Sequence, residues 1–205
     1  MYADPPTQIK KQEEMKKDII LAGVGGQGIL TIATIIGNAA AVAGIHLKQA
    51  EVHGMSQRGG DVQSNLRLST EPIYSDLIRE GQADMIISME PMEALRYVPY
   101  LGEGGQIITS SNEFRNIPNY PDSEALAQEL KSLPNVTALP IEDMAKDGGW
   151  AKSANVVLLG MAAPHLGILS VEALRESIVR VFASKGEAVV EANLQAFEQG
   201  VKAAK

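Results

Sequence analysis

The segment Asp18 to Leu30, DIILAGVGGQGIL, constrains the fold of this chain more than any other. An apolar run at Ile19 to Ala22 leads into a glycine-rich turn at Gly23 to Gly28, and residues typical of a helix follow. The run shows no polar alternation, which predicts a strand buried on both faces of a sheet. A buried strand, a glycine turn and a helix in this order indicate an α/β fold.

The glycine turn carries the first group of candidate site residues. Glycines at positions 23, 25 and 28 satisfy the pattern G-x-G-x-x-G, and Glu51 follows at the end of the second predicted strand, as in a dinucleotide fingerprint. Such glycines let phosphate oxygens approach the backbone at the positive end of a helix. The alternative is that they serve only the turn and close packing. The candidates are Gly23, Gly25, Gly26, Gln27 and Gly28.

A second group of candidates lies on the loop EVHGMSQRGG at Glu51 to Gly60. Functional side chains concentrate on such loops, and Arg58 can bind a carboxylate or phosphate with two hydrogen bonds. The alternative is a surface loop whose Arg58 pairs with Glu51 or Asp61. The candidates are Glu51, His53, Ser56, Gln57, Arg58, Gly59 and Gly60.

The remaining pattern predicts a three-layer α/β/α domain with a Rossmann-like first βα unit, a mainly parallel or mixed sheet, and a helical C-terminal third. Residues 1–17 are expected to form a flexible leader, and residues 18–205 a single domain. Val62 to Ser69 is expected to be a half-exposed, antiparallel strand. The other predicted strands are Ile45 to Val52, Met85 to Met89, Gln106 to Thr109 and Val136 to Ile141. The predicted helices are Ile29 to Ala43, Met92 to Val98, Ser123 to Leu130 with Ser123 as its cap, Trp150 to Leu166, one capped by Ser170, and Glu187 to Lys202.

Composition excludes several kinds of function. A net charge of −7 argues against binding to nucleic acid, which needs an excess of Lys and Arg. The chain has no cysteine, which excludes disulfides and thiolate ligands for iron–sulfur clusters or zinc, and fits a reducing cytoplasm. His46 and His165 show no metal-binding spacing, so no metal site is expected. No apolar window reaches the length of a membrane span.

Several separated segments together resemble the small, or beta, subunits of indolepyruvate ferredoxin oxidoreductases. More broadly, the chain is similar to the gamma subunit or domain of the 2-oxoacid ferredoxin oxidoreductases, from about Asp18 to the C-terminus. The sequence HGMSQRGG at His53 to Gly60 resembles that of the indolepyruvate branch. The other matching segments are GVGGQG at Gly23 to Gly28, VQSNLRLS at Val62 to Ser69, ADMIISMEPMEALRY at Ala83 to Tyr97, NVVLLG at Asn155 to Gly160 and ANLQAFEQG at Ala192 to Gly200.

This resemblance implies a complex that decarboxylates an arylpyruvate on thiamine diphosphate with Mg, transfers the acyl group to coenzyme A and passes electrons through 4Fe-4S clusters to ferredoxin. The chain has no cysteine for clusters, and its one Gly-Asp pair, Gly60-Asp61, lacks the G-D-G pattern of a diphosphate–magnesium site. The resemblance therefore implies a subunit without its own cofactor, which binds a large thiamine diphosphate and iron–sulfur subunit and meets ferredoxin indirectly. Coenzyme A pyrophosphate is expected near Gly23 to Gly28 or Arg58. Catalytic residues of this chain are left unassigned.

Other functions remain open at this point. Within the resemblance, the substrate can instead be pyruvate, ketoisovalerate or 2-oxoglutarate. Outside it, the chain can be a free-standing Rossmann dehydrogenase, favoured by the glycines and Glu51, or a nonenzymatic interaction scaffold. The apolar C-terminal third favours burial against another chain or a homodimer of the isolated protein.

Overall fold

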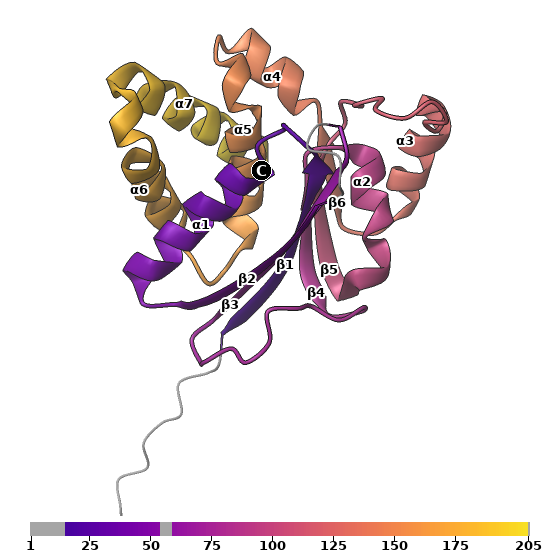
Figure 1. Cartoon of the computed structure of the whole chain (residues 1–205). Helices are drawn as coiled ribbons and strands as arrows, with labels where there is room; N and C mark the ends of the chain where they lie inside the picture. Colours follow the sequence, from indigo (N-terminus) through magenta and orange to yellow (C-terminus); the bar gives the residue numbers. More distant parts are fainter. Residues whose placement is uncertain (1–14, 54–58, 205) are drawn as a thin grey trace, which may run out of the picture.

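The computed structural model describes residues 15–53 and 59–204, which form a mixed sheet with helices on both faces (Figure 1). The described strands pair in the order β2-β3-β1-β4-β5-β6. Only β3 runs antiparallel to its neighbours, so the carboxyl ends of the other five strands lie along one edge of the sheet. The strands are β1 (Lys16–Val24), β2 (His46–His53), β3 (Asp61–Ser69), β4 (Ala83–Ser88), β5 (Leu101–Ser110) and β6 (Val136–Leu139).

Strand β1 is the centre of the fold, as its apolar run predicts. Ile19, Ile20 and Leu21 are completely buried, since helices cover both faces of this strand. The strand begins at Lys16, so the expected leader of residues 1–17 is wrong for Lys16 and Lys17. These two residues continue the ladder with β3, where Lys16 lies opposite Ser69, and the Lys16 ammonium lies 2.9 Å from the buried Asp18 carboxylate.

Helices cover both faces of the sheet (Figure 1). One face is covered by α1 (Ile29–Ala43), α4 (Ile141–Asp147), α5 (Ala154–Ala162), α6 (Val171–Phe182) and α7 (Glu187–Ala203). The other face is covered by α2 (Pro91–Arg96) and α3 (Ser123–Ser132). Short 3-10 turns occur at Val98–Tyr100, Ala151–Ser153, Ala163–His165 and Ala183–Lys185. The three-layer α/β/α architecture, the mixed sheet and the helical C-terminal third are therefore confirmed. None of the helices in the described part of the chain is both long and apolar enough to cross a membrane.

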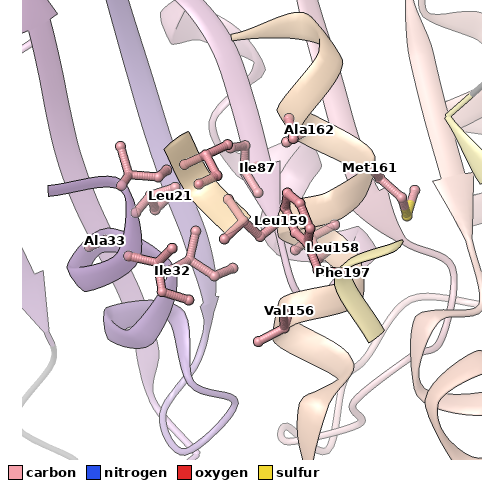
Figure 2. Packing of buried hydrophobic residues seen from close by; sticks show 14 of the residues in the cluster. Leu21, Ile32, Ala33, Ile87, Val156, Leu158, Leu159, Met161, Ala162 and Phe197 are labelled. Atoms are coloured by element: carbon pink, nitrogen blue, oxygen red, sulfur yellow. The ribbon is translucent and has the colours of Figure 1, made fainter. Parts of the chain in front are cut away.

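The larger core is built around α5, in which every residue is buried. Figure 2 shows Leu158 and Leu159 of this helix among side chains of the sheet, of α1 and of α7. A helix that is apolar all round needs cover on every side, and here the sheet and α7 provide it. The helix is shorter than the predicted Trp150 to Leu166, because 3-10 turns replace its two ends.

Three local predictions are wrong. Strand β3 is mostly buried rather than half-exposed, because residues after the strand cover its polar face, where the Ile78 N–H donates to the side chain of the buried Asn65. Helix α3 is capped by the side chain of Asp122, and Ser123 is its first residue. The last strand ends at Leu139, since Pro140 cannot continue the ladder and Ile141 begins α4.

Candidate functional site

The candidate site lies at the edge of the sheet where the parallel strands end, the place where open α/β sheets bind ligands. The first glycine loop follows β1 there, Gly59 and Gly60 lead into β3, and Glu90 follows β4. Residues 111–122, which join β5 to α3 and are named the strap below, cross the same edge. The fold thus brings four loops of the described chain together.

The first glycine loop is held in place by Gln27. Its side-chain oxygen accepts a 2.7 Å hydrogen bond from the Val24 backbone N–H, and its amide nitrogen lies 3.4 Å from the Met89 carbonyl oxygen, to which it donates. Gly26 and Gly28 have φ angles of 101° and 85°, which L side chains rarely adopt. The side chain of Gln27 therefore braces the loop from inside.

Gly28 ends the loop and begins α1, where no side chain caps the helix. The carbonyl oxygen of Gly28 accepts a 3.0 Å hydrogen bond from the side-chain amide of Asn155, at the start of α5. A Cβ atom at Gly28 would lie 2.7 Å from the same nitrogen of Asn155. Glycine is therefore needed here both for its φ angle and for the approach of Asn155, and the α1 N-terminus keeps its partial positive charge unneutralised by a side chain.

The two glycine loops meet directly. The backbone N–H of Gly25 donates a 2.8 Å hydrogen bond to the carbonyl oxygen of Gly60. They do not follow neighbouring strands, as a simple α/β order suggests, because β3 lies between β1 and β2. This contact between Gly25 and Gly60 is named the glycine junction below.

The second group of sequence candidates is only partly described. Ser56, Gln57 and Arg58 lie outside the described residues, and of His53 only the backbone, paired with Val62, is described. Glu51 lies in β2 opposite Ser64 of β3, one strand further from the first glycine loop than a dinucleotide fingerprint requires. The structure therefore does not bring Glu51 beside the first loop.

A groove of about 760 Å³ borders the outer side of the first glycine loop. Gly26, Gln27 and Gly28 form one wall, and the α6–α7 corner forms the opposite wall. The exposed side chains of Lys152 and Lys185 lie on the groove, and the Lys185 ammonium lies 5.1 Å from the centre of the Phe182 ring. The remaining lining residues are Thr31, Gly149, Trp150, Ala151, Ser153, Asn155, Phe182, Ala188, Val189, Ala192 and Asn193. Two ammonium groups and an apolar wall beside a helix N-terminus suit an anionic ligand with an apolar part.

Buried carboxylates follow β4, and a half-buried one follows β6, at the same edge. Glu90 is completely buried, and its carboxylate accepts a 2.8 Å hydrogen bond from the Glu93 N–H as the cap of α2. Burial raises the pKa of Glu93, although its ion pair with Arg96 opposes this. Burial also raises the pKa of Glu142, against a 2.7 Å hydrogen bond donated by the Ser110 hydroxyl. Over residues 15–53 and 59–204, no group of three or more His, Cys, Asp or Glu side chains is arranged to hold a metal ion.

The sequence did not single out Glu90, Asn116, Tyr120, Lys152 or Lys185. Glu90 precedes Pro91, and an acidic residue before proline at a helix start is a recognisable cap signal. Asn116 and Tyr120 lie in a segment for which the sequence predicts neither helix nor strand, and Lys152 and Lys185 are far apart in sequence. Their arrangement depends on tertiary contacts that no local pattern encodes.

The model of the family described as pyruvate ferredoxin/flavodoxin oxidoreductase matches residues 18–203 of this chain. Among curated proteins, the chain is similar to the indolepyruvate oxidoreductase subunit IorB of Thermococcus kodakarensis. The two are 40% identical over 200 residues, which cover 92% of this chain and 96% of the relative.

Two solved structures have a similar fold. The gamma subunit of a keto/oxoacid ferredoxin oxidoreductase from Geobacter sulfurreducens PCA superposes with a TM-score of 0.67 at 30% identity, over 92% of this chain and 98% of that one. The 2-oxoglutarate:ferredoxin oxidoreductase of Magnetococcus marinus superposes with a TM-score of 0.72 at 23% identity, over 92% of this chain and 31% of that one. The second likeness bears on the fold alone.

Proposed function

The chain belongs to the pyruvate ferredoxin/flavodoxin oxidoreductase family and is a subunit of a 2-oxoacid:ferredoxin oxidoreductase, and we propose that it is the small, cofactor-free subunit of an indolepyruvate-type enzyme. One observation carries this assignment: a chain matched by the family from residue 18 to residue 203 contains no cysteine. The proposal therefore assigns the redox centres to another polypeptide.

The residues of this chain do not fit the cofactors of such a complex. Iron–sulfur clusters are held by cysteine thiolates, and this chain has none. The diphosphate of thiamine is held through Mg, which prefers carboxylate oxygens, and the described residues contain no group of three or more His, Cys, Asp or Glu side chains placed to hold a metal ion. Both cofactors are therefore assigned to a large partner subunit, which also meets ferredoxin.

The glycine junction is the part of the surface assigned to this partner. It lies at the carboxyl edge of the sheet and joins two loops, each with glycines that let another backbone approach closely. The junction adds no reactive side chain of its own. Its role in this proposal is to complete the walls of an active site whose reacting groups come from the large subunit.

Coenzyme A is assigned to the groove beside the first glycine loop. Lys152 and Lys185 offer positive charge for its phosphates, and the uncapped N-terminus of α1 offers backbone N–H groups for the pyrophosphate. Trp150 and Phe182 offer apolar surface. Coenzyme A, when bound, supplies the thiol that accepts the acyl group.

The substrate assignment is supported by the likeness to an indolepyruvate oxidoreductase subunit and by the sequence HGMSQRGG. Pyruvate, ketoisovalerate and 2-oxoglutarate are the alternatives, and the groups that choose among them are assigned to the large subunit. A free-standing dehydrogenase is disfavoured because Glu51 lies one strand too far from the glycine loop.

The test is co-purification of this chain with the large subunit encoded for the same complex, followed by assay of the pure complex with four substrates. Reduction of a viologen dye should be fastest with indolepyruvate and should require coenzyme A. An assembled complex that prefers another of the four would leave the subunit role standing and overturn the substrate. Assembly without effect on turnover would favour the interaction scaffold, and nicotinamide binding by the free chain would favour the dehydrogenase.

A further inference from the structure

The strap, residues 111–122, crosses the carboxyl edge of the sheet without helix or strand structure of its own. Its first residue is tied to the end of β6 by a 2.8 Å hydrogen bond from the Ser111 N–H to the Leu139 carbonyl oxygen. Its apolar residues Phe114 and Ile117 are 46% and 36% exposed, so apolar burial holds it only in part. Polar contacts contribute the rest of what sets its position.

The buried carboxylate of Glu90 is the main anchor of the strap. One of its oxygens caps α2, and the other accepts hydrogen bonds from the Tyr120 hydroxyl and, at 3.4 Å, from the Phe114 N–H. A buried carboxylate is stable only when such donors surround it. Burial, together with this hydrogen bond, raises the pKa of Tyr120, so its hydroxyl remains a donor at any ordinary pH.

Between these two anchored residues, Asn116 reaches the glycine junction. Its side-chain nitrogen donates a 2.8 Å hydrogen bond to the carbonyl oxygen of Gly59. Gly59 has a φ angle of 77° and precedes Gly60, which accepts the hydrogen bond from Gly25. One side chain of the strap therefore fixes the peptide next to the one that joins the two loops.

The other end of the Asn116 amide is buried without a partner among the described residues. Leaving a buried amide oxygen unpaired costs about 1–3 kcal/mol. Among the described residues, the hydrogen bond that the Asn116 side chain makes is therefore the one to the junction.

We propose that Asn116 is a positioning residue for the reaction of the complex: it holds the glycine junction in shape, and Glu90 holds Asn116 in place through Tyr120. The inference rests on the proposed function for its effect on turnover. Loss of the Asn116 donor frees Gly59 and Gly60, weakens the hydrogen bond to Gly25, and loosens the first glycine loop where coenzyme A is assigned.

The first test uses the free, full-length chain and amide hydrogen exchange followed by NMR. Asn116→Asp keeps the shape of the side chain but replaces the donor, and Asn116→Ala removes it. Both variants lose the hydrogen bond from Asn116 to Gly59, which loosens the neighbouring bond between Gly25 and Gly60. Exchange of the Gly25 amide should therefore become about tenfold faster, while exchange of the Ile20 amide of β1 should not change. Tyr120→Phe should act in the same direction. Asn119→Ala, in the same strap and exposed, is the matched control.

The second test uses the assembled complex and separates KM from kcat. Asn116→Ala should raise the KM for coenzyme A by about threefold or more with little change in kcat, and Asn119→Ala should leave both unchanged. Unchanged exchange at Gly25 in both Asn116 variants would overturn the inference whatever the activity. Faster exchange with an unchanged KM and kcat would overturn it as well. A wild-type complex without turnover dependent on coenzyme A would contradict the proposed function, while the exchange result would still decide whether Asn116 holds the junction.

Discussion

The backbone N–H of Gly25 and the carbonyl oxygen of Gly60 lie 2.8 Å apart and join the two glycine loops of this protein. Strand β3 begins directly after Gly60 and lies between the parallel strands β1 and β2. Its antiparallel pairing with β1 brings Gly60 next to Gly25, so this contact depends on the position of β3 in the sheet. The inserted strand also moves Glu51 away from the first loop. With this strand order, the first glycine loop contacts the second glycine loop and does not lie beside Glu51.

Gly28→Ala should destabilise the free chain more than Gly26→Ala. Both glycines have positive φ angles, so alanine is strained at either position, but only at Gly28 would the new Cβ atom meet Asn155, at 2.7 Å. The loss of the Asn155 hydrogen bond should add about 1 kcal/mol to the difference. Urea unfolding of the two variants measures it, and equal losses of unfolding free energy would contradict the described contact.

Gly160→Ala should cost about 2–3 kcal/mol of unfolding free energy, because added atoms cannot fit in a packed contact. Gly160 of α5 and Gly200 of α7 lie where the two helices cross, and a Cβ atom at Gly160 would be 2.2 Å from the Phe197 carbonyl oxygen. Gly37→Ala in α1 is the matched control, since its Cβ atom would make an ordinary contact 3.7 Å from Leu47. That variant should be neutral or gain up to about 1 kcal/mol in helix propensity.

Glu142→Gln should become more stable relative to the wild type as pH rises. Burial raises the pKa of Glu142 in the folded chain above its ordinary value of 4.5, so the folded state binds more protons than the unfolded state above that pH. Wild-type stability therefore falls with rising pH through this carboxyl, and glutamine removes the effect. Urea unfolding of both proteins at pH 4.5 and pH 7 measures the change.

The matched control for this pH dependence is Glu80→Gln, because Glu80 is exposed. This variant corrects for the loss of one carboxylate from the protein surface. If the stability of Glu142→Gln relative to the wild type does not increase from pH 4.5 to pH 7, the Glu142 carboxyl is not desolvated in the folded chain.

Replacing Lys152 and Lys185 with alanine together should raise the KM for coenzyme A in the assembled complex by about fivefold, as expected for two charged contacts with phosphate. The value of kcat should change little, because both side chains line the groove and the reacting groups are assigned to the large subunit. The effect should shrink as salt concentration rises. The control is Lys131→Ala, at an exposed position of α3 outside this groove, which should leave the KM for coenzyme A as in the wild type. An equal rise in KM with this control would contradict the assignment of coenzyme A to the groove.

Local signals in the sequence predicted the regular elements well. Helix α1 runs from Ile29 to Ala43 as expected, because Gly28 and Gly44 bound it and both adopt left-handed conformations. Ser170 caps α6 as expected through its side chain. Helix α4 was missed, since its charged sequence IEDMAKD has only a short apolar pattern after Pro140.

Long-range arrangement was beyond the sequence. The burial of β3 depends on residues after the strand, where the Ile78 N–H donates to Asn65, and no periodicity within the strand reveals this contact. The glycine turn after the first strand was predicted, but the hydrogen bonds from Asn116 to Gly59 and from Tyr120 to Glu90 join residues that lie far apart in the chain. Hydrogen bonds between such distant residues depend on the fold as a whole.

The most direct measurement of the central claim is the rate of 2-oxoacid-dependent viologen reduction by the large subunit, with coenzyme A, in the presence and absence of this chain. Turnover that requires both polypeptides, with neither active alone, is the predicted result, since this chain has no cysteine for redox centres and is expected to complete the site. Full turnover by the large subunit alone, or oxidation of substrate by this chain alone, would contradict the account.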